Sequence, residues 1–182
     1  MDIIKFLRSL AHSPIHNYGG IPGLTSWLIQ RNDDGSMVRL MECCRDHQEP
    51  IIPHSHRFDF KCLVLAGKVV NVMWHNNGNH NFVTGDAFIQ SEMIYGGEPG
   101  QYKKVPGPIN KWNRSFHNYE KGDEYQMTAD QVHSIFFSRG AMVLFFEGPQ
   151  VSDRNIILEP VVDGEVIPTF QVPQWAFKRG AV

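Results

Sequence analysis

Cysteine is scarce in this chain of 182 residues, and its placement argues against an extracellular scaffold. There are three cysteines: Cys43 and Cys44 are adjacent, and Cys62 lies inside an apolar run. An odd number that includes an adjacent pair is a poor basis for a disulfide framework. We therefore interpret the three residues as inert thiols, buried in the fold, and expect a reducing, cytoplasmic location.

An excess of positive charge and long apolar runs are also lacking. The chain has 17 Lys and Arg against 19 Asp and Glu, and its net charge is -2. This balance does not favour a nucleic-acid partner. No apolar run is long enough to span a bilayer, so we expect no membrane partner. The opening MDIIKFLRSLAH has no long apolar core and no small-residue cleavage site, and it predicts a short amphipathic helix over residues 2–11.

Signatures of several common catalytic sites are missing as well. The chain contains no glycine-rich phosphate loop, no G-x-S-x-G elbow and no C-x-x-C pair. Phosphate-cradling, serine-nucleophile and zinc-knuckle chemistry are therefore unsupported.

The sequence is instead rich in aromatic residues and turn signals. It has 12 Phe, five Tyr and four Trp, with 16 Gly and 11 Pro spread along the chain. Short apolar segments separated by these turn residues predict an all-β sandwich or barrel. We expect one domain over residues 1–182, with a core at about 36–148 and a tail, 149–182, that packs on the barrel.

Individual strands can be assigned from the same pattern. SWLIQRNDDGSMVRLMECC predicts a hairpin that turns at DDGS, and FDFKCLVL and KVVNVMW predict two strands joined at Ala66-Gly67. QYKKV and SFHNY are expected to be separate strands, because the intervening PGPINKWNR carries the proline and glycine of a loop.

Histidines mark the candidate site. His54 and His56 precede the apolar run FDFKCLVL. Residues i and i+2 of an extended segment point to the same side, so both imidazoles can reach one metal ion, with a third ligand from another strand. Imidazole suits zinc, iron, copper and nickel. The alternative is a pair of surface histidines at the end of a loop.

Two motifs in this context resemble the cupin superfamily. His54, His56 and Gly67 follow the spacing of the first cupin motif, G-x5-H-x-H-x(3,4)-E-x6-G, and Gly122 and His133 follow that of the second, G-x5-P-x-G-x2-H-x3-N. The resemblance covers about residues 38–147, and HSHRFDF is similar to a subgroup of bacterial, RmlC-like cupins with an H-x-H-x-x-D-F signature. It implies a single cupin barrel, a double-stranded β-helix or jelly roll, with His54, His56 and His133 as metal ligands. The superfamily also has metal-free members, in which such histidines are packed polar residues.

The motifs depart from the family pattern at the position of the ligand glutamate. Phe60 or Lys61 occupies that position, and Asp59 precedes it. A bulge after His56 would turn Asp59 inward as a fourth ligand. Strict alternation would instead send Phe58, Phe60 and Cys62 inward and leave three histidines. Asp59 would then pair with Arg57 or cap a turn.

The resemblance implies a metal-dependent function. We expect a non-heme Fe(II)-dependent dioxygenase that acts on a small organic molecule, with zinc, nickel or manganese as other possible ions. Asp59 and Gln126 are the candidate catalytic residues, since either Tyr125 or Gln126 should face the cavity and Gln126 can hydrogen-bond substrate. A metal-dependent isomerase or lyase and a non-catalytic small-molecule-binding cupin are the alternatives. Cupins often pair through sheet edges, so a homodimer is also expected.

Overall fold

The computed structural model describes residues 3–10, 13–46, 52–76, 85–96 and 101–161. Apart from helix α1 (Ile3–Leu10) and a 3-10 turn at Tyr18–Gly20, its regular elements are strands. The expected helix at 2–11 is therefore present, with its ends outside the described residues. Among the described residues, the structure contains no helix with the length and apolar character that crossing a bilayer requires.

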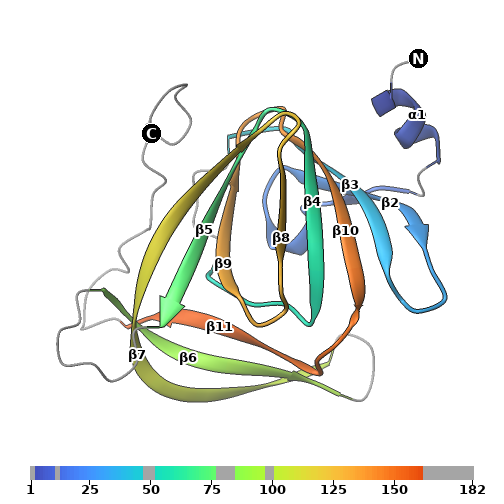
Figure 1. Ribbon diagram of the computed structural model, residues 1–182. Helices are drawn as coiled ribbons and strands as arrows, with labels where there is room; N and C mark the ends of the chain where they lie inside the picture. The colour runs from blue at the N-terminus through green and yellow to red at the C-terminus, as the bar shows by residue number, and fades with distance from the viewer. Residues whose placement is uncertain (1–2, 11–12, 47–51, 77–84, 97–100, 162–182) are drawn as a thin grey trace.

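The strands form two antiparallel sheets (Figure 1). The six-stranded sheet has, in spatial order, β1 (Ile15–His16), β2 (Leu24–Arg31), β3 (Met37–Cys43), β10 (Met142–Gln150), β4 (Phe58–Ala66) and β8 (Glu124–Met127). The five-stranded sheet has β11 (Arg154–Pro160), β6 (Asp86–Tyr95), β7 (Tyr102–Glu120), β5 (Lys68–Asn76) and β9 (Val132–Phe137). In Figure 1, β6 and β11 cross beneath β5, β9, β8, β4 and β10, and β7 runs from one group to the other.

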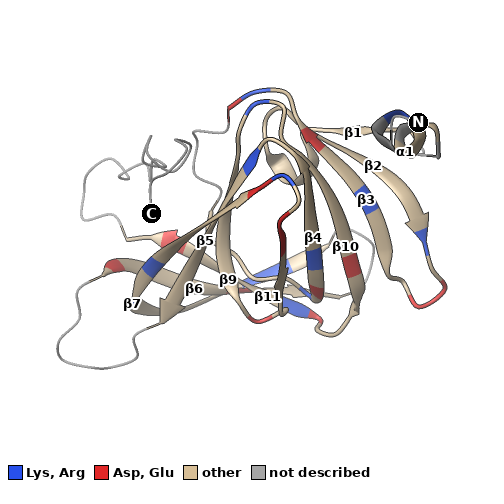
Figure 2. Ribbon diagram, turned by 45° about the horizontal axis from the view of Figure 1, so that its top comes forward, with Lys and Arg blue, Asp and Glu red and all other residues tan. Residues whose placement is uncertain are grey.

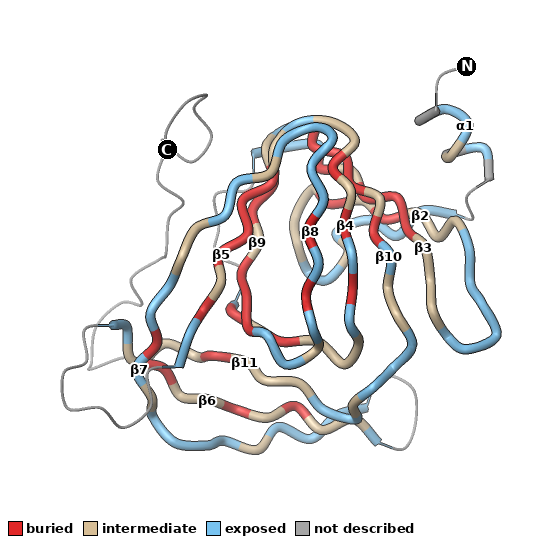
Figure 3. The backbone as a smooth tube through the Cα atoms, in the orientation of Figure 1, coloured by how far each residue is buried: buried red, intermediate tan, exposed pale blue. Residues whose placement is uncertain are grey.

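Two hydrophobic clusters occupy the interior. One lies between β5 and β9 above and β6 and β11 below, and it includes Val72, Trp74, Phe136 and Leu158. The other is built mainly by the six-stranded sheet and the opposite face of β9, and it includes Phe60, Tyr125 and Phe145. Figure 3 shows the buried residues concentrated on β5, β9, β4, β8 and β10, while β7 is largely exposed. The all-β fold with a single cupin barrel, expected from the sequence, is confirmed by this architecture.

Turn chemistry explains the β4–β5 hairpin. Gly67 has a φ of 68°, in the left-handed region that favours glycine. A Cβ atom at this position would also lie 2.6 Å from the Cα atom of Ala141. The expected turn at Ala66-Gly67 and the expected hairpin between β2 and β3 are both present.

The expected loop at PGPINKWNR is wrong. The segment lies inside β7, which runs without interruption from Tyr102 to Glu120. The ladder with β6 has a register shift between Ile89 and Ser91, and Gly107 passes so close to Gln90 there that a Cβ atom would collide with its carbonyl oxygen. Pro106 and Gly107 therefore sit at a bulge, where a strand tolerates residues that otherwise signal a loop.

The boundary of the expected tail also differs. The segment 149–161 is not merely a cover, because β11 forms seven consecutive pairs with β6 as an edge strand of the five-stranded sheet. Residues 162–182 of the expected tail lie outside the described residues.

Charged side chains of both signs are distributed over the strands (Figure 2). The described strands show no extended stretch of a single sign in this view, in keeping with the small net charge of -2.

Candidate metal centre

The segment Pro53–His56 is held by backbone hydrogen bonds on both sides. His54 forms an isolated antiparallel bridge with His133 of β9, in which each backbone N–H donates to the other's carbonyl at 2.9 Å. On the opposite side, the N–H of Ser55 donates to Ile156 O at 2.9 Å and that of Leu158 donates to Pro53 O at 2.8 Å. We call this segment the histidine strap. It brings His54 and His56 to His133, a residue of another strand.

The three imidazole rings form an almost equilateral triangle. Their centroids are 4.9 Å apart for His54 and His56, 5.1 Å for His54 and His133, and 5.0 Å for His56 and His133. Their candidate ligand atoms all lie within 4.8 Å of one another. The sequence-predicted set of three histidines is thus brought together in the structure.

The distances fit a shared metal ion. The Nε2 atoms of His56 and His133 are 2.9 Å apart. Two imidazole nitrogens at about 2.1 Å from one ion are about 3.0 Å apart at a right angle and at most about 4.2 Å apart. The His56–His133 separation matches the first value, whereas the limit of 4.8 Å for the whole cluster exceeds the second, so the rings would close slightly around a shared ion.

Hydrogen bonds fix the tautomers of two of these rings. The Nδ1–H of His54 donates to the carbonyl oxygen of Ile52 at 2.9 Å, since a carbonyl can only accept. The Nδ1–H of His133 donates to Asn71 Oδ1 at 2.7 Å. Both Nε2 atoms therefore keep their lone pairs, which is the form that binds a metal.

Asn71 is itself oriented by sulfur atoms. Its Nδ2 donates to Met127 Sδ at 3.3 Å and to Met73 Sδ at 3.5 Å, so its oxygen must face His133. Asn71 is 2% exposed. Sequence reasoning missed this residue, although its position on the neighbouring strand β5, opposite Ile135, follows the same inward alternation as His133.

The surroundings keep the imidazoles neutral. Burial, together with the neighbouring His54, lowers the pKa of His56 to about 3. Burial also lowers the pKa of His54 and, together with the other two rings, holds the pKa of His133 well below its ordinary value. Neutral imidazole is the state in which histidine binds a metal ion, so protons do not compete with the ion near neutral pH.

A cavity of about 420 Å³ opens from the histidines. Aromatic and aliphatic side chains make up most of its wall. They include Ile21, Leu24, Met41, Phe58, Phe60, Ile135, Phe137, Val143 and Phe145. The cluster thus lies at one end of a mostly apolar space of a size suited to a small molecule.

Strict alternation describes β4. Phe58, Phe60 and Cys62 line the cavity, whereas Asp59 is exposed. The Asp59 Oδ1 atom accepts a hydrogen bond from the backbone N–H of Ala129 at 2.7 Å. The structure therefore does not bring Asp59 to the three histidines, and its carboxylate secures the turn between β8 and β9.

The same alternation separates Tyr125 from Gln126. Tyr125 lines the cavity and is buried, and Gln126 is exposed on the outer side of β8, near Asp59 and Lys61. Of the two residues between which sequence reasoning was undecided, it is Tyr125 that reaches the cavity. Burial raises the pKa of Tyr125 well above its ordinary value and raises the pKa of Cys62 to about 12, so both groups stay protonated.

Comparisons with known proteins found similarity at a low level. No family model and no curated protein sequence matches the chain. Among solved structures, an RmlC-like cupin from Shewanella frigidimarina is 14% identical, with a TM-score of 0.40, over 78% of this chain and 86% of that one. Identity this low says nothing of activity.

Two further solved structures are similar at the same low level. Streptomyces albus HEPD, with 2-hydroxyethylphosphonate and Fe(II) bound, is 12% identical with a TM-score of 0.48 over 78% of this chain. The 7S globulin of Momordica charantia is 12% identical with a TM-score of 0.49 over 88% of it. The chain spans only 25% of HEPD and 39% of the globulin. What the chain itself defines is a cupin barrel whose three histidines can hold a divalent metal ion.

Proposed function

We propose that this protein is a non-heme Fe(II)-dependent dioxygenase that acts on a small organic molecule, with His54, His56 and His133 as the protein ligands. The observation that carries the proposal is the triangle of neutral imidazoles at the end of an apolar cavity, in which the Nε2 atoms of His54 and His133 keep their lone pairs. When bound there, Fe(II) would supply the electrons and the template that bring dioxygen and substrate together.

The residues around the cluster have separate tasks. Asn71 and the carbonyl of Ile52 hold His133 and His54 in the ligating tautomer. Phe58, Phe60 and Phe145 exclude water from the space beside the rings. The Tyr125 hydroxyl stays protonated and can donate a hydrogen bond into the cavity.

The cavity favours redox chemistry over a metal-dependent isomerase or lyase. Proton transfer in such enzymes needs a general base besides the metal ligands. Among the described residues that line the cavity there is no Asp, Glu or Lys, and the pKa values of Tyr125 and Cys62 are raised, so neither is a base near neutral pH.

The expected cytoplasmic location and homodimer belong to the same proposal. The free thiols of Cys43, Cys44 and Cys62 support a reducing compartment. The short β1 and the adjoining β2 at one edge of the six-stranded sheet support pairing through that edge.

The test is the metal content of protein purified without chelator, followed by anaerobic loading with Fe(II) and measurement of oxygen uptake with candidate small molecules. We expect about one iron per chain in the wild type and none in His54→Ala or His133→Ala. Zinc or nickel bound in preference to iron, without oxygen uptake, would favour the isomerase or lyase. A wild type that takes up no Fe(II) would contradict the proposal and leave a non-catalytic binding protein.

A further inference from the structure

Three polar groups that line the cavity are not satisfied by the described part of the chain. The Tyr125 hydroxyl and the Asn155 Oδ1 atom are buried and have no hydrogen-bond partner. The Arg57 guanidinium stacks over the ring of Tyr95, 4.1 Å from its centroid, and within the described ranges no acceptor or carboxylate pairs with it. Buried polar groups are normally paired, so the first two indicate where a ligand would bind, and the partly exposed Arg57 lies in the same cavity wall.

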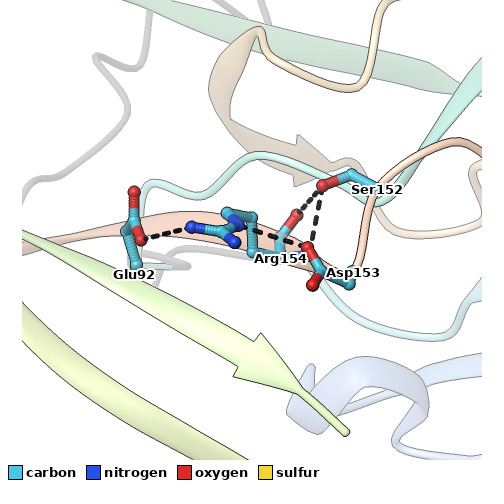
Figure 4. A network of polar contacts seen from close by, with 4 residues as sticks. All are labelled: Glu92, Ser152, Asp153 and Arg154. Carbon is cyan, nitrogen blue, oxygen red and sulfur yellow. Dashed lines mark hydrogen bonds and ion pairs between the residues drawn. The ribbon is translucent and has the colours of Figure 1, made fainter.

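Arg154 provides a comparison, because its guanidinium is paired with carboxylates of the chain. Arg154, at the start of β11, lies between two carboxylates (Figure 4). Its Nη1 is 3.2 Å from Glu92 Oε2, and its Nε is 3.2 Å from Asp153 Oδ1. The Arg154 charge is neutralised within the chain. The contrast makes Arg57 the guanidinium with capacity for an external anion.

The carboxylate of Glu147, which interacts electrostatically with Arg57, already forms an ion pair with Arg39. Burial raises the pKa of Glu147, and among the arginines that oppose this shift Arg39 has a larger influence than Arg57. The Nε atom of Arg39 lies 3.6 Å from Glu147 Oε2. Both side chains of this pair are about nine-tenths buried, at 9% and 10% exposed. Glu147 is therefore engaged by Arg39, and within the described ranges Arg57 forms no ion pair with it.

The histidine cluster adds no negative charge. Its three ligands are neutral imidazoles, and Asp59, the candidate carboxylate, lies outside it. The cavity wall therefore contains no anionic side chain among its described residues, and one cation stands on its rim.

We propose that the substrate is a small organic monocarboxylate with an aromatic or branched apolar body, bound through its carboxylate by Arg57. This inference rests on the proposed function, whose substrate class it names. A planar guanidinium matches a carboxylate through two parallel hydrogen bonds. The apolar body would pack against Phe58, Phe60 and Phe145.

The length of the substrate follows from the position of β11. Asn155 and Ile157 are on the same face of the strand, and Ile157 forms a bridge with His54. Two residues of a strand span about 6.6 Å. A molecule with a chain of a few carbon atoms can therefore reach from the rim, near Asn155 and Arg57, to the histidines. A hydroxyl or amino group on it would donate to Asn155 Oδ1.

The test is calorimetric titration of the protein with 3-phenylpropionate and with its neutral amide. Wild type, Arg57→Met and the matched control Arg154→Met are compared, each loaded with Co(II) and each treated with chelator. We expect the wild type and Arg154→Met to bind the acid about tenfold or more tightly than the amide. Arg57→Met should lose this preference while binding the amide as before. Circular dichroism confirms that each variant is folded.

The two proposals fail separately. Cobalt uptake with equal binding of acid and amide, or with no binding of either, overturns the inference and leaves the metal centre intact. Arg57-dependent binding of the acid to a protein that takes up no cobalt supports the inference and contradicts the Fe(II) proposal. Tighter, Arg57-dependent binding of 2-phenylethylphosphonate than of the acid would overturn the monocarboxylate assignment.

Discussion

The two faces of β9 have opposite properties. On the face that we call closed, Val132 and Phe136 belong to the hydrophobic cluster beneath β5 and β9. Ser134 lies between them and accepts a hydrogen bond from Trp74 Nε1 at 3.2 Å. His133, Ile135 and Phe137 line the cavity on the other face. On the closed face, the polar Ser134 is hydrogen-bonded. On the cavity face, His133 keeps a lone pair toward the other histidines. Alternation along one strand therefore separates residues that stabilise the fold from residues that bind.

The largest effect is expected on the cavity face. His133→Ala removes a ligand and should abolish retention of the metal ion after dialysis, a greater loss than the 10- to 100-fold typical for residues that only orient ligands. Metal content by mass spectrometry measures it, and Ser134→Ala, one residue along on the closed face, is the control. Full metal content in His133→Ala would show that the ion is bound elsewhere.

Phe136→Ala tests the closed face. Phe136 is 0% exposed, and truncation of a buried phenylalanine costs about 3–5 kcal/mol of the free energy of unfolding. Urea denaturation of the chelated protein gives this value. The fraction that remains folded should bind metal with the stoichiometry of the wild type. Loss of metal binding from the folded fraction would show that packing on the closed face of β9 affects the metal ligands on the cavity face.

Asn71→Ala tests the hydrogen bond by which β5 orients a ring of the histidine cluster. It leaves the Nδ1–H of His133 without its acceptor, and we expect metal affinity to fall by about 10- to 100-fold. Asn71→Asp keeps an oxygen acceptor and should retain most of the affinity. Competition with a chromogenic chelator measures both. Equal losses in the two variants would point to packing, and not to the hydrogen bond, as the cause.

The smallest effect is expected for Asp59→Ala, on the outer face of β4. It removes one hydrogen bond, from Ala129 N–H, and should cost about 0.5–1.5 kcal/mol of stability. Its metal content should equal that of the wild type. Loss of metal in this variant, in a folded protein, would restore the fourth-ligand hypothesis.

These residues also show how far the sequence could predict the site. The spacing of His54, His56 and His133 was sufficient to predict that the three imidazoles come together, because extended segments alternate and the motifs have a known order. The side on which Asp59 lies depends on whether a bulge follows His56, and no local signal decides this. Gln126 and Tyr125 posed the same question of register, which is set by the pairing of Cys62 with Tyr125 in the β4–β8 ladder.

The errors in the fold have a common physical origin. Pro106 and Gly107 are loop signals by local propensity, yet pairing with β6 on one side and β5 on the other keeps β7 extended through them. The residues of β11 have no strong strand pattern, and they pair because the edge of β6 is available. Asn71 was missed as a partner of the site because its role depends on contacts between strands distant in sequence.

The double attachment of the histidine strap has a consequence for folding. His54 pairs on one side with His133 and on the other with Ile157, residues about eighty and a hundred positions further along the chain. Closing loops of this length is slow, and neither pair can form before β9 and β11 have found their sheets. The metal ligands should therefore be among the last parts of the molecule to become ordered as it folds. Early in refolding the three histidines would still be apart. The chain would bind its metal ion only after β11 has paired with β6 and with the histidine strap.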